Sequence, residues 1–271
     1  PHLVVFLLFL TAIRIGPRDA LVGLKNIGAT LKVVLMFQLG LPLAALVLFG
    51  LIGVAQSPYA MAVVLVLAAP ALTGSPNLSI LLGADPEPAF RLLILGTALL
   101  PATMLPVFWM SPQLGDLTVA LWGALRLLAA IWTAITLGFV LRVLALPAMS
   151  LDQTDVLDGI MTLALVVIVV GLMGALGPTL VQSPVKALTW MALAFAINIG
   201  MQVLAFVFLA NASRKEQAVP YSIVAGNRNV ALFLVTMTPA QTDPFLIFLG
   251  GYQVPMYLTP ILLRRFYQSK R

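Results

Sequence analysis

The sequence contains no cysteine and only one histidine, His2. Without cysteine there is neither a disulfide framework nor a thiolate metal site, and one histidine cannot build a metal centre alone. We therefore expect no metal and no cofactor from these residues. Charged residues are also scarce, at 9%, whereas hydrophobic residues make up 61% and the mean hydropathy is +1.07. This composition is too apolar for the surface of a soluble protein and predicts an all-α, polytopic membrane protein.

Motifs of enzymes and of nucleic-acid-binding proteins are missing as well. No apolar segment carries a Ser-His pair, a Cys-His pair or a carboxylate dyad, and no glycine loop suited to phosphate is present, so an enzyme is disfavoured. The net charge of +6 arises from basic residues that flank apolar segments rather than form a stripe. We therefore attribute it to membrane topology and expect no nucleic-acid partner.

Nine apolar segments approach the ~20 residues that a helix needs to cross a bilayer. They cover about 1–13, 28–54, 59–83, 89–110, 118–146, 158–181, 185–211, 218–237 and 245–264. No separate soluble domain fits, and the longest polar stretches, 150–158 and 212–217, are predicted to be loop-sized. Asp152, Asp155 and Asp158 recur every third position, which leaves a cation-binding row or a solvated loop and helix N-terminus as interpretations.

Basic residues fall almost entirely on alternate connections. One side carries Arg14, Arg18, Lys25, Lys32, Arg91, Arg142, Arg214, Lys215, Arg264, Arg265, Lys270 and Arg271, and the other carries Lys186. The positive-inside rule places the first side, and with it the C-terminus, in the cytoplasm of a protein integral to the inner cell membrane. Arg126 lies within a segment and is expected to snorkel to the interface.

A Gly-x-x-Asn motif followed by an apolar run occurs once in each half, at Gly74–Asn77 and at Gly226–Asn229. Inverted-repeat transporters build their sites from paired interrupted helices near the middle of the membrane. Prolines and glycines suited to interrupting a helix accompany both copies, namely Pro70, Gly74, Pro76 and Gly226. We therefore expect helix breaks near 70–77 and near 225–229.

Polar residues at or facing these breaks are the candidates for binding a solute: Thr73, Ser75, Asn77, Asn198, Asn227, Arg228 and Asn229. An arginine near the membrane centre costs on the order of 3 kcal/mol, so Arg228 requires compensation, and the usual compensation is function. Asn198 and Gln202 lie four positions apart and hence on one helix face. The alternative for the asparagines is a structural role as hydrogen-bonding bridges between helices.

With these motifs the chain resembles the bile acid:sodium symporter family, within the superfamily that also holds the auxin efflux carriers. Ala69-Pro70-Ala71-Leu72-Thr73-Gly74-Ser75-Pro76-Asn77 is similar to the signature of the family's fourth helix, and Ser222-Ile223-Val224-Ala225-Gly226-Asn227-Arg228-Asn229 to that of the ninth. Weaker matches are Phe37-Gln38 before Pro42, and Asn198 in the eighth helix. The resemblance implies two inverted five-helix repeats, a panel and a core domain, and crossing broken helices.

Under this resemblance, residues 1–146 hold the family's helices two to six, with the break near 70–77. Residues 147–271 hold helices seven to ten, with the break near 225–229, and the whole forms one integrated membrane domain. The family's first helix would precede Pro1.

Sodium is the coupling ion that the resemblance implies, with Gln38, Ser75 and Asn77 as candidate ligands. In the family, a glutamate and a glutamine of the ninth helix help to hold sodium, whereas this sequence has Val224 and Arg228 at those positions. Sodium needs oxygen ligands, and a guanidinium has only donors. We therefore expect the second sodium site to be absent, and Pro76 alters the first, so sodium coupling does not carry over with the resemblance.

The sequence therefore predicts a secondary transporter that moves a small organic anion by alternating access, with the lipid bilayer and the anion as its partners. Arg228 is expected to replace the coupling ion as a tethered cation and to hold a carboxylate or sulfonate. The rival role for Arg228 is a structural hydrogen bond to backbone carbonyls at the break. Two other functions remain open: a uniporter or proton-coupled efflux carrier of the same fold, and a non-transporting membrane sensor or assembly subunit.

Overall fold

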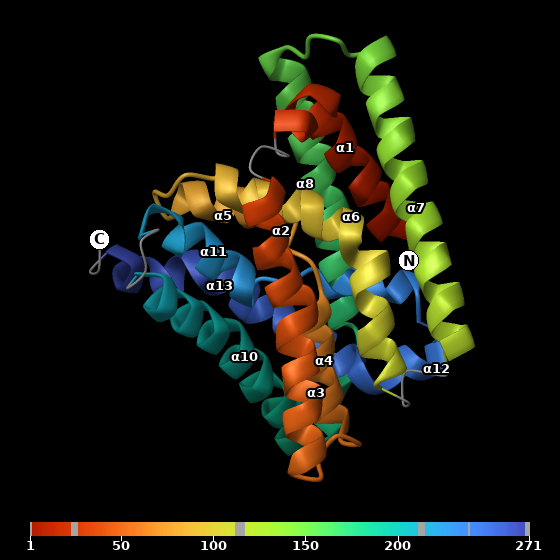
Figure 1. Ribbon diagram of the computed structural model, residues 1–271, viewed down its shortest axis with the longest axis vertical. Helices are drawn as coiled ribbons and strands as arrows, with labels where there is room; N and C mark the ends of the chain where they lie inside the picture. The colour runs from red at the N-terminus through yellow and green to blue at the C-terminus, as the bar shows by residue number, and fades with distance from the viewer. Residues whose placement is uncertain (1, 23–26, 112–116, 211–214, 238, 269–271) are drawn as a thin grey trace.

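The computed structural model describes residues 2–22, 27–111, 117–210, 215–237 and 239–268. Over these residues the chain is helical and forms no β-strand (Figure 1). Within the described part of the chain, six helical stretches are long and apolar enough to cross a membrane: Ile27–Leu51, Glu87–Trp109, Leu121–Leu144, Leu151–Gln182, Pro184–Ala210 and Leu246–Gln268. The protein is thus an α-helical membrane protein, as its composition predicted.

The described residues form these elements in chain order. They are α1 (His2–Val22), α2 (Ile27–Leu35), η1 (Met36–Gly40), α3 (Leu41–Leu51), α4 (Pro58–Ala68), α5 (Ser75–Leu81), α6 (Glu87–Trp109), α7 (Leu117–Leu144), α8 (Leu151–Met173), α9 (Leu176–Gln182), α10 (Pro184–Ala210), η3 (Lys215–Gln217), α11 (Ala218–Gly226), η4 (Val230–Val235), α12 (Pro239–Thr242), η5 (Asp243–Phe245) and α13 (Leu246–Gln268).

Two predicted boundaries were wrong. The stretch 150–158 is not a loop, because Ser150 and Gln153 form a capping box that starts α8 at Leu151. Gln153 N donates to Ser150 Oγ at 3.2 Å, and Ser150 N donates to Gln153 Oε1 at 3.0 Å, so two amides at the helix start are satisfied locally. The first segment does not end near 13, since α1 continues to Val22 across a kink at Gly16.

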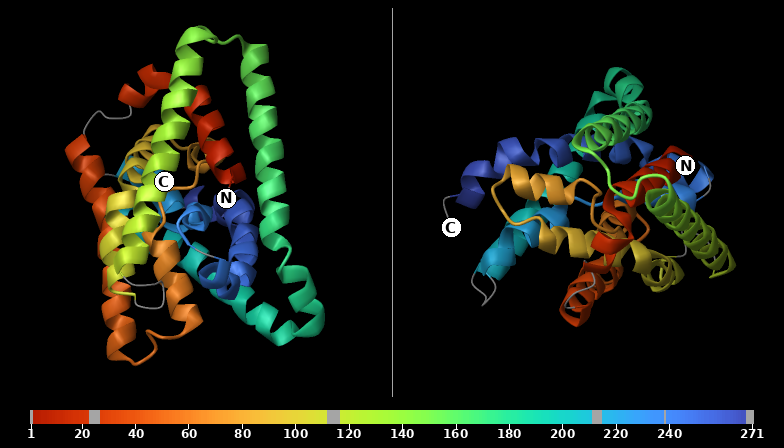
Figure 2. Two further views of the ribbon diagram at one scale, coloured as in Figure 1. Left: turned by 90° about the vertical axis from the view of Figure 1, so that its right-hand side faces the viewer. Right: turned by 90° about the horizontal axis from the view of Figure 1, so that it is seen from above.

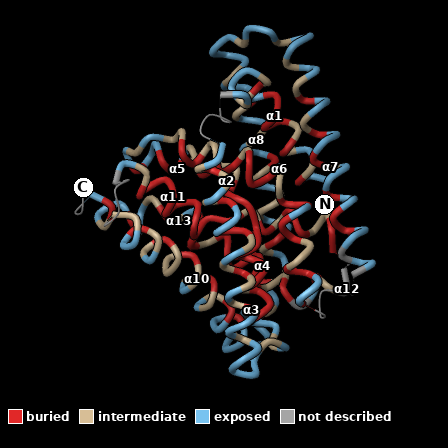
Figure 3. The backbone as a smooth tube through the Cα atoms, in the orientation of Figure 1, coloured by how far each residue is buried: buried red, intermediate tan, exposed pale blue. Residues whose placement is uncertain are grey.

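The long helices α7 and α8 follow each other at one end of the molecule, and α1 packs against both of them (Figure 2). Elsewhere α10 packs along α11 and α13, while α6 contacts α2, α5 and α7. Buried residues gather toward the centre of the molecule, on α4, α11 and α13 among other elements, and the outer helices carry mostly exposed residues (Figure 3). The interrupted segments 58–81 and 218–235 therefore lie in the protein interior.

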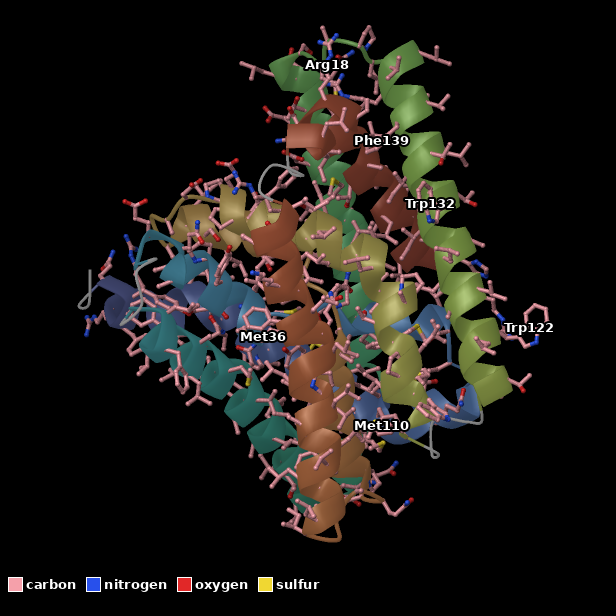
Figure 4. All side chains as sticks on the ribbon, in the orientation of Figure 1. Arg18, Met36, Met110, Trp122, Trp132 and Phe139 are labelled. Atoms are coloured by element: carbon pink, nitrogen blue, oxygen red, sulfur yellow. The ribbon has the colours of Figure 1, made fainter. Side chains whose placement is uncertain are left out.

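Large apolar side chains cover the outer faces of α7, α8 and α10. Examples are Trp122, Val170 and Phe208, exposed by 59%, 66% and 76%, and Trp122 points away from the other helices (Figure 4). A contiguous apolar surface of this kind is unfavourable in water, but it suits contact with lipid chains. The burial pattern therefore agrees with a membrane-embedded bundle.

Candidate functional site

The first helix interruption follows directly from Pro70. Proline lacks an N–H and disfavours a helical conformation of the residue before it, so Ala69 is extended, with φ −68° and ψ 151°, and α4 ends at Ala68. Helical structure resumes only at Ser75, the first residue of α5, with Pro76 close behind it. Residues 70–73 thus cross the protein interior between the two helices, while Ala69 N still donates to Leu65 O and Gly74 O accepts from Leu78 N.

The second interruption separates α11 from η4. α11 ends at Gly226, and Asn227 is extended, with φ −104° and ψ 97°. The chain turns into the short 3₁₀ helix η4 at Val230. Both breaks predicted from glycine, proline and asparagine thus exist at the expected places.

The two interruptions cross and pair with each other. Leu72 N donates to Asn227 O at 3.0 Å, and Asn229 N donates to Pro70 O at 2.9 Å. Between them Ala71 and Arg228 form an antiparallel β-bridge. An unpaired backbone group away from water costs several kcal/mol, so each break satisfies amides and carbonyls that the other has freed.

Arg228 lies at this crossing and is 2% exposed. Its Nε donates to Ala225 O at 3.1 Å, and its Nη1 donates to Ala69 O at 3.0 Å. These carbonyls belong to the C-terminal ends of α11 and α4, where the helix dipole is negative. The guanidinium carbon also lies 4.8 Å from the centre of the Phe37 ring, within the range of a cation–π contact.

Within the described part of the chain, the charge of Arg228 has no counter-ion and one of its donor groups has no acceptor. No carboxylate there forms an ion pair with it, since the two ion pairs are Arg14–Asp158 and Arg91–Glu87. Its Nη2 is buried and has no hydrogen-bond partner. The arginine is therefore a desolvated cation with one free donor group.

Behind the crossing, a buried polar network fixes the end of α11 to α10 and α13. Asn198 Nδ2 donates to Gly226 O at 2.6 Å and to Asn227 Oδ1 at 3.2 Å, and the Tyr252 hydroxyl donates to Gly226 O. Gln202 Nε2 donates to Asn198 Oδ1 at 2.9 Å. The network continues through Thr259 and Tyr267.

Gly226 is required here by the close approach of α10. A Cβ added to it would overlap the Asn198 carbonyl oxygen and the Gln202 side chain. The missing side chain allows the backbone of α11 to contact α10 directly, where Asn198 and Tyr252 both reach the Gly226 carbonyl oxygen.

In front of the crossing lies a cavity of about 220 Å³, bounded by α1, α8 and α13. Polar lining residues come from both interruptions and from the neighbouring helices: Thr73, Asn77, Asp158, Thr162, Arg228, Asn229, Gln253 and Tyr257. The apolar walls come mainly from α1 and α8, for example Leu8 and Met161. The cavity thus combines apolar walls with a polar floor that contains a buried cation.

The sequence-predicted residues divide between these two regions. Thr73, Gly74, Asn77, Arg228 and Asn229 line the cavity. Asn198 and Asn227 do not, because both belong to the buried network and have no exposed surface. Their hydrogen bonds match the structural alternative, a bridge between helices.

The candidate sodium ligands do not share one site. Ser75 is fully buried, with no partner for its Oγ among the described residues, whereas Asn77 lines the cavity. Gln38 lies in the π-helical turn η1, where its Oε1 accepts a hydrogen bond from Thr103 Oγ1 at 3.3 Å. Its neighbour Phe37, rather than Gln38 itself, contacts Arg228.

Sequence reasoning missed several residues. Asp158 was expected in the loop-sized stretch 150–158, but it lies two turns inside α8, lines the cavity and pairs with Arg14, Nε to Oδ1, at 2.8 Å. The recurrence of Asp152, Asp155 and Asp158 at every third position was the sequence feature that could have indicated a helix here. Tyr252, Thr259 and Tyr267 gave no such signal, because aromatic and threonine residues in apolar helices usually serve packing.

The fold and the site together define an α-helical membrane protein with a cavity at two crossed interruptions, and the lining of that cavity includes the buried cation Arg228. No family model matches the sequence, and no curated protein matches it either.

Proposed function

We propose that this protein is a secondary transporter of a small organic anion, and that Arg228 serves as a built-in substitute for a coupling cation. The proposal includes the resemblance to the bile acid:sodium symporter family, with inverted repeats around the crossing. Its main support is the environment of Arg228, which is buried at the crossing with no carboxylate partner among the described residues and with Nη2 unpaired.

The location of the guanidinium supports the role of a substitute cation. In transporters with interrupted helices, the carbonyls at the C-terminal ends of the half-helices and of the unwound backbone coordinate the coupling ion. Arg228 donates to such carbonyls at Ala69 and Ala225. A charge that is covalently attached cannot dissociate, so under this proposal sodium is not needed to complete the site.

The charge of the cavity supports an anionic substrate. Two charged residues line it, Arg228 and Asp158, and Asp158 is already paired with Arg14. The excess charge next to the polar floor is therefore positive. A carboxylate or sulfonate supplies the acceptor oxygens that a guanidinium lacks, and Thr73, Asn77 and Asn229 offer further hydrogen bonds.

The cavity volume restricts the size of that anion. At about 220 Å³ it is smaller than the roughly 300–1,000 Å³ of sites that hold drug-sized ligands. We therefore propose a compact carboxylate or sulfonate rather than a steroid-sized molecule as the substrate.

Ligand stabilisation followed by flux tests the proposal. The purified chain is screened by thermal shift against small carboxylates and sulfonates, in sodium buffer and in choline buffer, because a ligand that binds the native state raises its stability. A hit is then tested as a labelled solute in proteoliposomes. We expect uptake to equal levels in both buffers, and no uptake into protein-free liposomes.

Arg228→Gln identifies the role of the cation, with Arg126→Gln as the matched control because Arg126 is exposed on α7. We expect Arg228→Gln to abolish the ligand shift and uptake, and Arg126→Gln to change neither. Anion uptake that survives Arg228→Gln would remove the substrate role. Binding without flux would favour a membrane sensor, and sodium-dependent binding by the unmodified chain would contradict the substitute cation.

A further inference from the structure

A second cavity, of about 190 Å³, lies far from the crossing, between the kink of α1 and the end of α7. Gly16, Arg18 and Asp19 line it from α1, and Arg142 lines it from α7. Arg18 lies at the end of the molecule near the connection between α7 and α8 (Figure 4). This cavity contains two arginines, and the transport proposal uses neither of them.

The kink at Gly16 determines the position of Arg142. Gly16 has φ 73° and ψ 162°, which interrupts the helical path of α1 in a conformation that favours glycine. A Cβ added there would lie 3.3 Å from Cγ and 3.4 Å from Nε of Arg142. Because Gly16 has no side chain, the backbone of α1 packs against the aliphatic part of the Arg142 side chain, and the guanidinium lies at the cavity.

Two donor atoms of that guanidinium lack acceptors in the described part of the chain. Nε and Nη1 of Arg142 are both buried, and neither finds a hydrogen-bond acceptor among the described residues. Asp19 lines the same cavity, yet it forms no ion pair with Arg142 in that part of the chain. A buried donor without an acceptor costs about 1–3 kcal/mol, more when it is charged, so two adjacent free donors indicate a missing acceptor group.

A phosphate group fits these donors. A guanidinium presents a planar fork that binds two phosphate oxygens at once, and Arg18 adds a second cation at the same cavity. The single carboxylate of Asp19 leaves the lining with an excess of positive charge. The chemistry of the cavity is therefore that of a site for an anionic phosphate ester.

The surroundings identify the ligand as a lipid. Leu141, Val143 and Leu144 are exposed by 40%, 55% and 78% on the last turns of α7. An apolar surface thus continues directly from the arginines along an outer helix. Basic pockets at the membrane interface between transmembrane helices bind the head groups of anionic lipids in this arrangement. We propose that the cavity at Gly16, Arg18 and Arg142 binds the phosphate of an anionic phospholipid.

The test compares lipids on the purified full chain in detergent. Phosphatidylglycerol, phosphatidylcholine, inorganic phosphate and glycerol phosphate are titrated separately, and lipid retention is measured by native mass spectrometry alongside the thermal midpoint. We expect phosphatidylglycerol to bind most tightly. Arg142→Gln is expected to weaken it about tenfold, the equivalent of one charge-assisted hydrogen bond. Arg126→Gln, on the same helix and outside the cavity, is the matched control.

Arg18→Gln provides a second variant that does not disturb packing, because Arg18 is exposed, and we expect it to weaken the same binding. Equal retention of phosphatidylcholine and phosphatidylglycerol would overturn the proposal. An equal loss with Arg126→Gln would also overturn it, since that result indicates general surface charge. Equal stabilisation by inorganic phosphate or glycerol phosphate would assign the cavity to a soluble phosphate instead.

Discussion

The two sides of the crossing contain similar polar side chains, which are hydrogen-bonded within the protein on one side and not on the other. Behind it, Asn198, Gln202, Asn227 and Thr259 are fully buried and hydrogen-bonded to one another and to the backbone. In front of it, Thr73, Asn77 and Asn229 line the cavity, and their side chains make no hydrogen bond to another described residue. Amides and hydroxyls are thus fully used on one side and available on the other.

This difference assigns a structural role to the polar residues behind the crossing and a candidate binding role to those in front of it. In a low-dielectric interior a fully satisfied polar network rigidifies the fold, whereas an unsatisfied group is costly unless it serves a ligand. Arg228 belongs to both sides, because Nε and Nη1 hold the two helix ends while Nη2 remains free. We therefore expect changes behind the crossing to affect stability first, and changes in front of it to affect anion binding first.

The largest expected effect comes from Gly226→Ala, since the added methyl group overlaps the Asn198 carbonyl oxygen. Overpacking of this severity costs about 3 kcal/mol or more, and we expect loss of the folded, monodisperse protein in detergent. Gly74→Ala is the matched control in the other interruption, because its nearest neighbour would be Leu72 Cδ2 at 3.8 Å. If both variants unfold to the same extent, the two sides of the crossing do not differ as described.

Arg228→Gln is expected to have the next largest effect on stability. It also tests whether the guanidinium occupies a site that a cation can fill. It removes two hydrogen bonds of a charged donor, at about 1.5–3 kcal/mol each, but it also removes a buried charge whose desolvation opposes folding, so the net loss should stay below that of Gly226→Ala. It also replaces donors with an amide oxygen beside the Ala69 and Ala225 carbonyls, which are oxygen ligands suited to sodium. We therefore expect sodium, compared with choline, to raise the thermal midpoint of the variant while leaving the unmodified chain unchanged.

Arg228→Lys is the control for charge in that experiment. It keeps a cation at the carbonyls, so it should remain insensitive to sodium and recover much of the lost stability. A sodium response from both variants, or from neither, would show that the guanidinium does not occupy a cation site.

Much of the fold was predictable because each cause lies in a short stretch of sequence. Apolar runs gave the helices, and Pro70 gave the end of α4, because its effect on Ala69 is local. Gly226 and the asparagines after it gave the second break. The errors at 150–158 and at Gly16 have local causes as well, a capping box and a glycine with positive φ, which hydropathy alone does not register.

The division of the candidate site was not predictable, because it depends on which helices meet. Asn198 and Asn77 are equivalent by residue type, yet only the first faces another helix closely enough to hydrogen-bond it. Phe37, Tyr252 and Tyr267 come from segments far apart in sequence and reach the crossing through tertiary packing alone. The pairing of Arg14 with Asp158 likewise requires α1 and α8 to be neighbours.

A comparison of Asn198→Ala with Asn77→Ala tests the division between network and cavity residues, with a smaller expected change in stability. Without the Asn198 amide, one hydrogen bond to the Gly226 carbonyl is lost and Gln202 loses an acceptor, at a cost of about 2 kcal/mol. Asn77→Ala breaks no hydrogen bond to a described residue, so its thermal midpoint should stay close to that of the unmodified chain. Anion binding, measured by the ligand-induced shift, should instead weaken more in Asn77→Ala.

The smallest expected change in stability is that of Asp158→Asn. Its ion pair with Arg14 is about half exposed, with side chains exposed by 48% and 44%, so its loss costs less than about 1 kcal/mol. Its effect on transport is more informative, because Asp158 is an acidic residue that lines the cavity. If uptake is driven by a proton gradient in the unmodified chain and loses that dependence in Asp158→Asn, the protein is a proton-coupled carrier.

Asp155→Asn, one turn earlier on α8 and exposed, controls for a general loss of negative charge. Under the anion-transport proposal we expect Asp158→Asn to bind the anion more tightly, since it removes the negative charge that faces Arg228 across the same cavity and leaves Arg14 unpaired. Asp155→Asn should leave both affinity and gradient dependence unchanged. Weaker anion binding in Asp158→Asn would mean that the carboxylate, rather than the guanidinium, is the principal contact of the solute.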